Sequence, residues 1–370
     1  MNVDILNRTG THLTSSNRLM IADCDIHPRI AGVKALYPWL SKRWQEHLET
    51  FGMAHRQPYE RGPAYPKAQP MASRRDSFPP GGGGPGSDLA FMAWQHLDAN
   101  NVELGILNPL TPSGQGAVNP DLSGAMAHAV NEWQVEKWTS QDARLKASIV
   151  VPYEDTAASV AEIERYAGNP HFAQVLLLSR TGEPPGQRRY WPIYEAAAAA
   201  GLPVAFHAFG HGGHPNTAGG WPSYYIEDMV GHAQSSQAGL VSLVVEGVFE
   251  RIPGLKVVFV EAGSAWAPSL LWRMDRQWKK LKAETPHLQK LPSEYVKSQV
   301  WFTTQPLEEP EPREHLLDAI EWLGWDRFLF ATDYPHWDFD DPAFALPVRV
   351  SEERRRQIFR TNANAVYGQS

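Results

Sequence analysis

The sequence predicts a single-domain (β/α)8 TIM barrel over residues 1–370. Three observations lead to this fold class. Eight short apolar runs recur along the chain, helical segments lie between them, and 42% of the residues are hydrophobic, which is enough for a large buried core. A doubly wound parallel sheet has a similar alternation of strands and helices and is the alternative fold.

The predicted strands are near-continuous apolar runs, as expected for parallel strands that are buried on both faces. They are Met20–Ile26, Val102–Leu107, Lys146–Val151, Ala173–Leu178, Pro203–Ala208, Lys256–Glu261, Gln299–Thr304 and Arg327–Asp333. The predicted helices are Ser123–Trp138, Thr156–Tyr166, Tyr190–Ala200, Ile226–Phe249, Ala265–Leu281 and Glu311–Leu323. Gly201 and Pro253-Gly254 mark two helix ends, each just before a strand.

One long insertion, Met53–Gly86, follows the first strand and is rich in proline, glycine and arginine. A disordered linker is one interpretation of that composition. The insertion also carries Tyr59, Tyr65, Met71 and Phe78, and in a barrel it leaves from the catalytic face. We therefore expect an ordered lid over the barrel mouth or a contact with a second subunit.

The charge and cysteine content argue against several classes of function. The formal net charge is −7 and no lysine–arginine cluster is present, so neither nucleic acid nor a membrane surface is an expected partner. Cys24 is the single cysteine, which excludes an intrachain disulfide and a cysteine-based zinc site. The first 20 residues are polar, and no run approaches the ~20 apolar residues of a membrane span. These features predict a cytoplasmic protein.

The first predicted strand carries Asp23, Asp25 and His27 at alternate positions. Alternate residues of a strand share a face, so we expect all three side chains in the barrel interior, with Asp25 and His27 nearest the mouth. A buried carboxylate is costly unless it is paired or bound to a metal. A metal site and a structural aspartate–histidine hydrogen bond are both compatible with this motif.

Three further strand ends carry ligand-type side chains. His207 ends the fifth strand and Asp333 the eighth. Alone, the first is typical of a core histidine and the second of a helix cap, but together with the first strand they favour a metal site. Glu261 ends the sixth strand, where it is a general acid or base, a further ligand to a second ion, or a partner for an arginine.

The predicted metal ligands are Asp25, His27, His207, Asp333 and Glu261. This nitrogen and oxygen set is typical of zinc, manganese, iron or cobalt rather than calcium, with one ion and room for a second. The predicted catalytic residues are Asp333, Glu261 and His336. The predicted substrate-binding residues are His211, Trp266 and Trp337, although His211 and the neighbouring His214 are equally compatible with solvated loop positions.

The order of these motifs resembles the amidohydrolase-related branch of the amidohydrolase superfamily, which includes aminocarboxymuconate semialdehyde decarboxylase and γ-resorcylate decarboxylase. The resemblance covers nearly the whole chain. It rests on the motifs Asp23-x-Asp25-x-His27, Trp191–Ala196 before Gly201-Leu202-Pro203, Gly254–Val258 leading to Glu261-x-Gly263 and Trp266, Arg273–Asp275, Asp333–His336, and Asn362-Ala363 before Tyr367.

The resemblance implies that Asp25, His27, His207 and Asp333 bind the metal. Two positions depart from the common family pattern. Asp25-x-His27 replaces a His-x-His pair and is nearer to the Glu-x-His form of some decarboxylases. Glu261 stands where many members have a histidine that acts on substrate or water.

The function expected from the resemblance is metal-dependent hydrolysis or non-oxidative decarboxylation of a small organic substrate. The metal would activate water or polarise a substrate oxygen, and Asp333 or Glu261 would transfer a proton. Arginines of the insertion are candidates to bind a substrate carboxylate: Arg56, Arg61, Arg74 and Arg75. The alternatives are a metal-dependent monooxygenase similar to isobutylamine N-hydroxylase, or a non-catalytic partner subunit. A homodimer or a hetero-oligomer with a paralogous subunit is the expected assembly.

Overall fold

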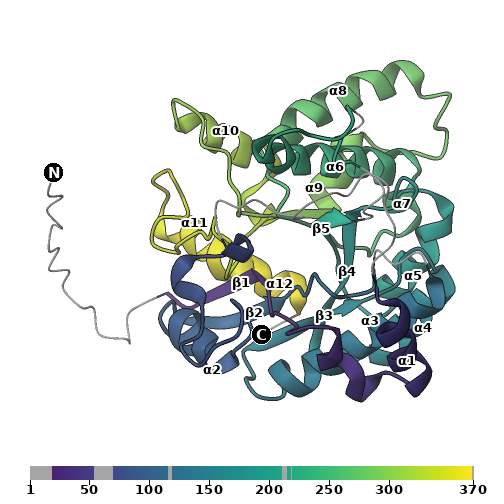
Figure 1. The fold of residues 1–370 in the computed structure, drawn as a ribbon. Coiled ribbons are helices and arrows are strands. Elements are labelled where there is room, and N and C mark those ends of the chain that lie inside the picture. The colour runs from purple at the N-terminus through teal and green to yellow at the C-terminus, as the bar shows by residue number, and fades with distance from the viewer. Residues whose placement is uncertain (1–18, 54–69, 116–118, 211–214, 218, 369–370) are drawn as a thin grey trace, which may run out of the picture.

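Eight parallel strands form one sheet in sequence order around the centre of the molecule, with the helices outside (Figure 1). The computed structural model describes residues 19–53, 70–115, 119–210, 215–217 and 219–368. The strands are β1 (Ile21–Ile26), β2 (Val102–Leu107), β3 (Leu145–Val150), β4 (Phe172–Arg180), β5 (Val204–Gly210), β6 (Val257–Val260), β7 (Val300–Thr303) and β8 (Phe328–Leu329). The predicted (β/α)8 barrel is confirmed.

The barrel closes between its first and last strands through backbone hydrogen bonds. Cys24 N donates to Phe330 O over 2.9 Å, and Asp333 N donates to Asp25 O over 3.1 Å. β8 is shorter than the predicted run to Asp333, because two amides there donate to side chains instead of a neighbouring backbone. Ala331 N donates to the Thr304 hydroxyl, and Thr332 N donates to the Asp23 carboxylate.

The predicted helices appear at the expected places, with one division. The prediction Ile226–Phe249 is split at Gly247, which has a φ of +84°, into two helices. The helices are α1 (Lys42–Phe51), α2 (Leu89–Met92), α3 (Pro120–Gln134), α4 (Thr156–Tyr166), α5 (Trp191–Ala199), α6 (Tyr225–Val245), α7 (Val248–Arg251), α8 (Trp266–Leu281), α9 (Pro292–Gln299), α10 (Glu314–Leu323), α11 (Glu352–Arg356) and α12 (Asn362–Tyr367). The sequence prediction missed α1, α2, α9, α11 and α12. All are ten residues or shorter, and so carry little periodic signal.

The described part of the insertion, residues 70–86, packs against the segment that follows β8. Arg74 N donates to Pro335 O over 3.0 Å, and Trp337 N donates to Ala72 O over 3.0 Å. Near the end of the insertion, Gly86 has a φ of +73°, and a Cβ there would lie 2.5 Å from the carbonyl oxygen of His27. The absence of a side chain thus lets this segment approach the end of β1 closely.

A polar layer crosses the barrel interior beneath the strand ends. The Asn108 carbonyl oxygen Oδ1 accepts from the Ser148 hydroxyl at 2.8 Å and from Gln174 Nε2 at 3.0 Å. The Tyr367 hydroxyl of α12 also donates to Gln174 Oε1 at 3.0 Å. Because these buried groups satisfy one another's hydrogen bonds, they hold β2, β3 and β4 in fixed positions relative to one another.

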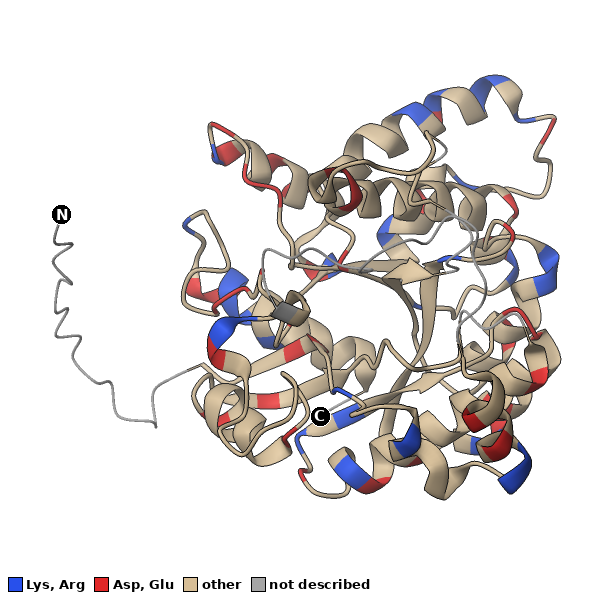
Figure 2. Ribbon diagram, in the orientation of Figure 1, with Lys and Arg blue, Asp and Glu red and all other residues tan. Residues whose placement is uncertain are grey.

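The exterior mixes charges of both signs, with lysines and arginines interspersed among acidic residues on the outer helices (Figure 2). Within the described ranges, no helix is both long enough and apolar enough to cross a membrane.

Candidate metal centre at the barrel mouth

A register shift in β1 separates the side chains of Asp23 and Asp25. Asp23 pairs with Gly105 and Ile26 with Leu107, so three steps on β1 match two on β2. Such an extra residue breaks the alternation of faces. The expectation that Asp23 shares a face with Asp25 and His27 is therefore wrong. The Asp23 carboxylate contacts the side chains of His96 and Thr332, whereas the side chains of Asp25 and His27 contact each other.

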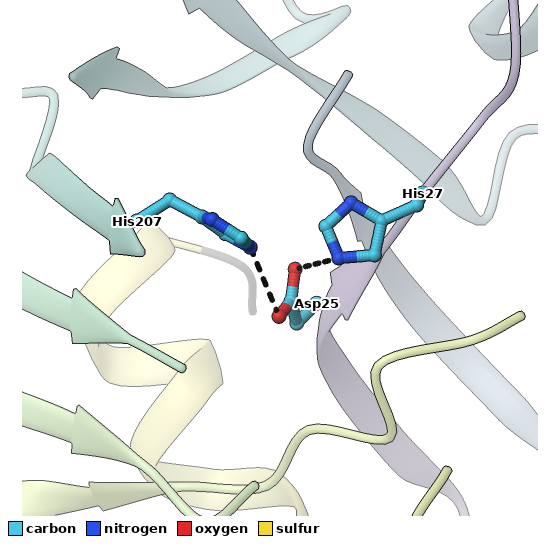
Figure 3. A group of neighbouring side chains, drawn as sticks. All are labelled: Asp25, His27 and His207. Atoms are coloured by element: carbon cyan, nitrogen blue, oxygen red, sulfur yellow. Dashed lines mark ion pairs between the residues drawn. The ribbon is translucent and has the colours of Figure 1, made fainter. Parts of the chain in front are cut away.

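Asp25, His27 and His207 meet at the mouth of the barrel (Figure 3). His27 Nε2 lies 3.1 Å from Asp25 Oδ1, and His207 Nε2 lies 3.5 Å from Asp25 Oδ2. The two imidazole rings are edge-to-face with centroids 5.0 Å apart, close enough for both to reach one ion.

Each of these histidines is held by its other ring nitrogen. His27 Nδ1 lies 2.7 Å from Asn108 O, and His207 Nδ1 lies 2.8 Å from Ala208 O. A carbonyl oxygen only accepts, so each Nδ1 carries the proton and donates it. This leaves Nε2 of both rings directed at Asp25, and such a backbone anchor is typical of histidines that bind metals.

Two more carboxylates complete the cluster. Glu261 Oε2 lies 3.4 Å from His207 Nε2, and Asp333 Oδ1 lies 2.9 Å from His27 Nε2. Both residues follow their strands with left-handed backbones, φ +55° for Glu261 and +60° for Asp333. That conformation is uncommon outside glycine and is frequent at functional sites. It turns the chain sharply at the strand end and directs both carboxylates toward the histidines.

His336 extends the cluster toward solvent. Its Nδ1 lies 2.6 Å from Asp333 Oδ1, and its ring stacks on that of His27 with centroids 4.4 Å apart. Its side chain is 22% exposed, whereas the five residues below it are 6% exposed or less. His336 therefore lies between the buried carboxylate and the barrel mouth.

The electrostatics of the cluster show an excess of negative charge. Burial alone would raise the pKa of the Asp25 carboxyl, but His27 and His207 outweigh burial and hold that pKa well below its usual range. Burial, together with repulsion from Asp333 and other neighbouring carboxylates, raises the pKa of Glu261 well above its usual range. Three carboxylates share two imidazoles here, which is the imbalance that a bound cation neutralises.

The donor atoms of the cluster fit a divalent metal ion. Five buried atoms lack a hydrogen-bond partner of acceptable geometry: Asp25 Oδ2, His27 Nε2, His207 Nε2, Glu261 Oε2 and Asp333 Oδ2. Three overlapping groups each have ligand atoms within 4.8 Å of one another: Asp25 with His27 and His207, His27 with Asp333 and His336, and Asp25 with Glu261 and Asp333. Buried polar atoms are normally paired, so such a cluster of ligand atoms is characteristic of a metal site.

The predicted substrate-binding residues lie in three different settings. Trp337 follows His336, is 42% exposed, and its indole N–H donates to the Tyr225 hydroxyl at 3.2 Å. Trp266 lies apart from the cluster: its ring packs edge-on to Phe302, and its N–H donates to Ala262 O at 2.8 Å. His211 and His214, as well as Arg56, Arg61, Tyr59 and Tyr65 of the insertion, lie outside the described residues.

The arginines of the described insertion do not face the cluster. Arg74 makes a bidentate ion pair with Asp76, with distances of 2.9 and 2.6 Å, and its guanidinium lies over the Phe339 ring. Arg75 is exposed.

Two residues that lie beside the cluster, Asn108 and Asp338, were not identified from the sequence. Asn108 donates from Nδ2 to Asp25 Oδ1 at 2.9 Å, in addition to anchoring His27. It directly follows the second strand, so the same strand-end logic that selected Asp333 could have found it. Asp338 accepts from Gln305 Nε2 at 3.1 Å, and burial together with the charge of Asp333 raises its pKa to about 8. No sequence pattern marks that residue.

Comparisons with known proteins agree with this geometry. A family model described as amidohydrolase matches residues 22–369. A γ-resorcylate decarboxylase from Polaromonas sp. (strain JS666 / ATCC BAA-500) is 25% identical over 289 residues, 73% of this chain and 85% of that protein. A crystal structure of 2,6-dihydroxybenzoate decarboxylase with 2,6-dihydroxybenzoate aligns with a TM-score of 0.62 and 22% identity, covering 76% of this chain and 89% of that one.

A third similar protein is the dihydroxybenzoic acid decarboxylase of Polaromonas sp. JS666, whose structure contains manganese and the inhibitor 2-nitroresorcinol. It aligns with a TM-score of 0.64 and 18% identity, covering 95% of this chain and 97% of that one. The barrel fold is therefore shared along almost the full length of both chains.

Proposed function

Since this chain belongs to the amidohydrolase family, we propose that it is a divalent-metal-dependent decarboxylase of small aromatic acids with a hydroxyl group beside the carboxyl group. The observation that carries this proposal is the cluster of five buried imidazole and carboxylate atoms at the barrel mouth that have no hydrogen-bond partner. The names of the similar proteins supply the substrate class, because both γ-resorcylate and 2,6-dihydroxybenzoate describe a carboxyl group flanked by hydroxyls.

In this proposal Asp25, His27, His207, Glu261 and Asp333 would hold the ion. Manganese suits this mixture of two imidazoles and three carboxylates. When bound, the ion supplies a Lewis acid that neutralises negative charge on the substrate oxygens. Glu261 contributes a carboxylate at the position where many members of the family have a histidine. This makes the set of metal ligands more anionic and favours a hard divalent cation.

The reaction requires a proton at the ring carbon that bears the carboxyl group. Once that carbon is protonated, the bond to the carboxyl carbon breaks, its electron pair returns to the ring, and carbon dioxide leaves. Asp333 is placed to pass a proton from His336 to the substrate, because its carboxylate lies between the His336 ring and the buried cluster. His336 is placed to replace it, because Nδ1 lies 2.6 Å from Asp333 Oδ1 and the ring is partly exposed.

The described residues 70–86 support a cover over this site. Ser73 pairs with His336 in an isolated antiparallel bridge, so the insertion lies against the residue proposed to exchange protons. We infer that residues 70–86 limit the access of water to the mouth, alone or with a second subunit. Water exclusion would strengthen every electrostatic interaction at the ion.

A direct assay tests the proposal. Protein purified without added metal and then loaded with Mn²⁺ is mixed with 2,6-dihydroxybenzoate, and resorcinol and carbon dioxide are measured. Benzoate is the control substrate because it lacks both hydroxyls, and Asp333→Asn is the control variant. We expect resorcinol and carbon dioxide from 2,6-dihydroxybenzoate with the unaltered enzyme, and no carbon dioxide from benzoate or with Asp333→Asn. Turnover of esters or amides, with no decarboxylation of any hydroxybenzoate, would replace this function with hydrolysis.

A further inference from the structure

Asp23 lies directly behind the metal cluster and accepts four hydrogen bonds. Its Oδ1 accepts from Asp25 N at 3.2 Å and from Thr332 N at 2.9 Å. Its Oδ2 accepts from the Thr332 hydroxyl at 2.5 Å and from His96 Nε2 at 2.7 Å. Asp23, His96 and Thr332 are all fully buried, so the network has no contact with solvent.

Two of these bonds fix the backbone around Asp25. The Asp23 carboxylate accepts the N–H two residues ahead, as in an Asx turn, at the register shift of β1. The extra residue of the shift removes Asp25 N from the regular strand pairing. Without the Asp23 carboxylate, this buried N–H would lose its partner, and the orientation of the Asp25 side chain would change with it.

The segment that follows β8 is fixed through Thr332. Its N–H and its hydroxyl both donate to Asp23, and its hydroxyl oxygen in turn accepts from Tyr334 N at 3.2 Å. Asp333 lies between these two anchored residues in a left-handed backbone with a φ of +60°. Such a conformation persists only where its surroundings hold it. Asp23 therefore holds the turn that aims Asp333 at His27.

His96 supports the carboxylate from the outer layer. Asn100 Nδ2 lies 3.0 Å from His96 Nδ1, which makes Nδ1 an acceptor and leaves Nε2 as the donor to Asp23. The His96 ring also stacks on Tyr334, with centroids 4.8 Å apart and an interplanar angle of 7°. All four groups around Asp23 donate hydrogen bonds to it. If an asparagine replaced Asp23, its amide N–H₂ would face other donors and at least one of these hydrogen bonds would be lost.

We propose that Asp23 is a positioning residue that sets the separation of two of the three acidic metal ligands, Asp25 on β1 and Asp333 after β8. It touches neither the ion nor the substrate. This inference rests on the proposed metal site and adds a network that the ligand positions alone do not define. Residues of this kind commonly change metal affinity or activity by about 10- to 100-fold when they are replaced.

The test compares Asp23→Asn with Glu162→Gln. Glu162 is the matched control, because it is a buried carboxylate that also accepts from a histidine and an asparagine, but it lies on α4 away from the mouth. The dissociation constant for Mn²⁺, the electron paramagnetic resonance spectrum of bound Mn²⁺ and the melting temperature of the metal-free protein are measured for each. We expect Asp23→Asn to weaken Mn²⁺ binding at least about tenfold and to alter the spectrum, whereas Glu162→Gln does neither.

Two Thr332 variants keep the test independent of folding. Thr332→Val removes the hydroxyl with little change of shape and should reproduce the Asp23→Asn effect on Mn²⁺, whereas Thr332→Ser should restore unaltered binding. If the unaltered protein binds Mn²⁺ and Asp23→Asn binds it equally well with an unaltered spectrum, Asp23 is merely structural and this inference fails alone. If the unaltered protein binds no divalent ion, the proposed function fails and this inference fails with it.

Discussion

Asp333 and His336 are joined by a contact of 2.6 Å between Oδ1 and Nδ1, which connects the most buried part of the site with its partly exposed rim. The same Asp333 oxygen lies 2.9 Å from His27 Nε2. One carboxylate thus contacts both a proposed metal ligand and a proposed proton carrier. Asp333 therefore couples the two roles, whereas His336 and His207 each have one of them in the proposal, so proton supply and metal binding are tested separately at those two histidines.

Replacing His336 by glutamine should slow turnover without removing the metal. In the proposal the other five residues of the cluster hold the ion, so metal content should stay unchanged, while kcat falls by about 10²- to 10⁴-fold because proton transfer is lost. A loss of metal would instead make His336 a ligand, since it has a ligand atom within 4.8 Å of those of His27 and Asp333. Kinetics and elemental analysis of the same sample check this. His128→Gln is the control, since His128 contacts Glu162 on the outer helices. An unchanged kcat in His336→Gln would assign the residue a structural role.

Replacing His207 by glutamine should abolish metal retention. A ligand should matter at least as much as the groups behind it, so the affinity for Mn²⁺ should fall by more than about 100-fold. His232→Gln is a matched control, because His232 is also a buried histidine near β5, with its ring 4.9 Å from Phe209. Burial lowers the pKa of His232 to about 4. Equal metal content in both variants would mean that His207 is an ordinary core histidine.

Glu261→Gln should eliminate turnover while the fold survives. The amide is nearly isosteric with the carboxyl group, but it cannot carry the negative charge or transfer a proton, and we expect a loss of about 10²- to 10⁴-fold in kcat. Glu308→Gln serves for comparison, since Glu308 accepts from the backbone N–H groups of Ser264 and Ala265 at the start of α8. Full activity of Glu261→Gln, with an unaltered melting temperature, would show that neither charge nor proton transfer is needed there.

Removal of the metal should lower the melting temperature, and readdition should restore it with the logarithm of the Mn²⁺ concentration above the dissociation constant. A ligand that binds only the folded state stabilises it by about 2.7 kcal/mol at a concentration 100 times its dissociation constant. Thermal scans after chelator treatment, at increasing Mn²⁺, measure this effect. The Asp25→Asn variant should show no such dependence. A melting temperature that is insensitive to both chelator and Mn²⁺ would argue against a metal bound at the mouth.

Cleavage within residues 70–86 should be slow and should reduce turnover. This segment contacts Pro335 and Trp337, so an intact segment is expected to keep His336 in place. Limited proteolysis followed by mass spectrometry and assay of the nicked protein tests this. Rapid cleavage that leaves both barrel and activity intact would make the segment a surface loop without a part in catalysis.

The periodic features of the sequence were sufficient for the fold and for most of the candidate site. Parallel strands buried on both faces leave uninterrupted apolar runs, so eight strands were visible without any tertiary information. In a barrel the carboxyl ends of all strands meet at one mouth, so residues far apart in the chain, such as Asp25, His207 and Asp333, could be expected to converge.

The tertiary structure decided what depends on register and on side-chain contacts between distant segments. The extra residue in β1 moved Asp23 away from Asp25, and no local pattern signals such a shift. The partly buried Trp266 ring packs edge-on against Phe302, a contact between β7 and the start of α8 that the sequence does not reveal. The Asp23 network joins β1 to Thr332, 309 residues away. Hydrogen bonds of this kind have no period along the chain, so only the closed barrel reveals them.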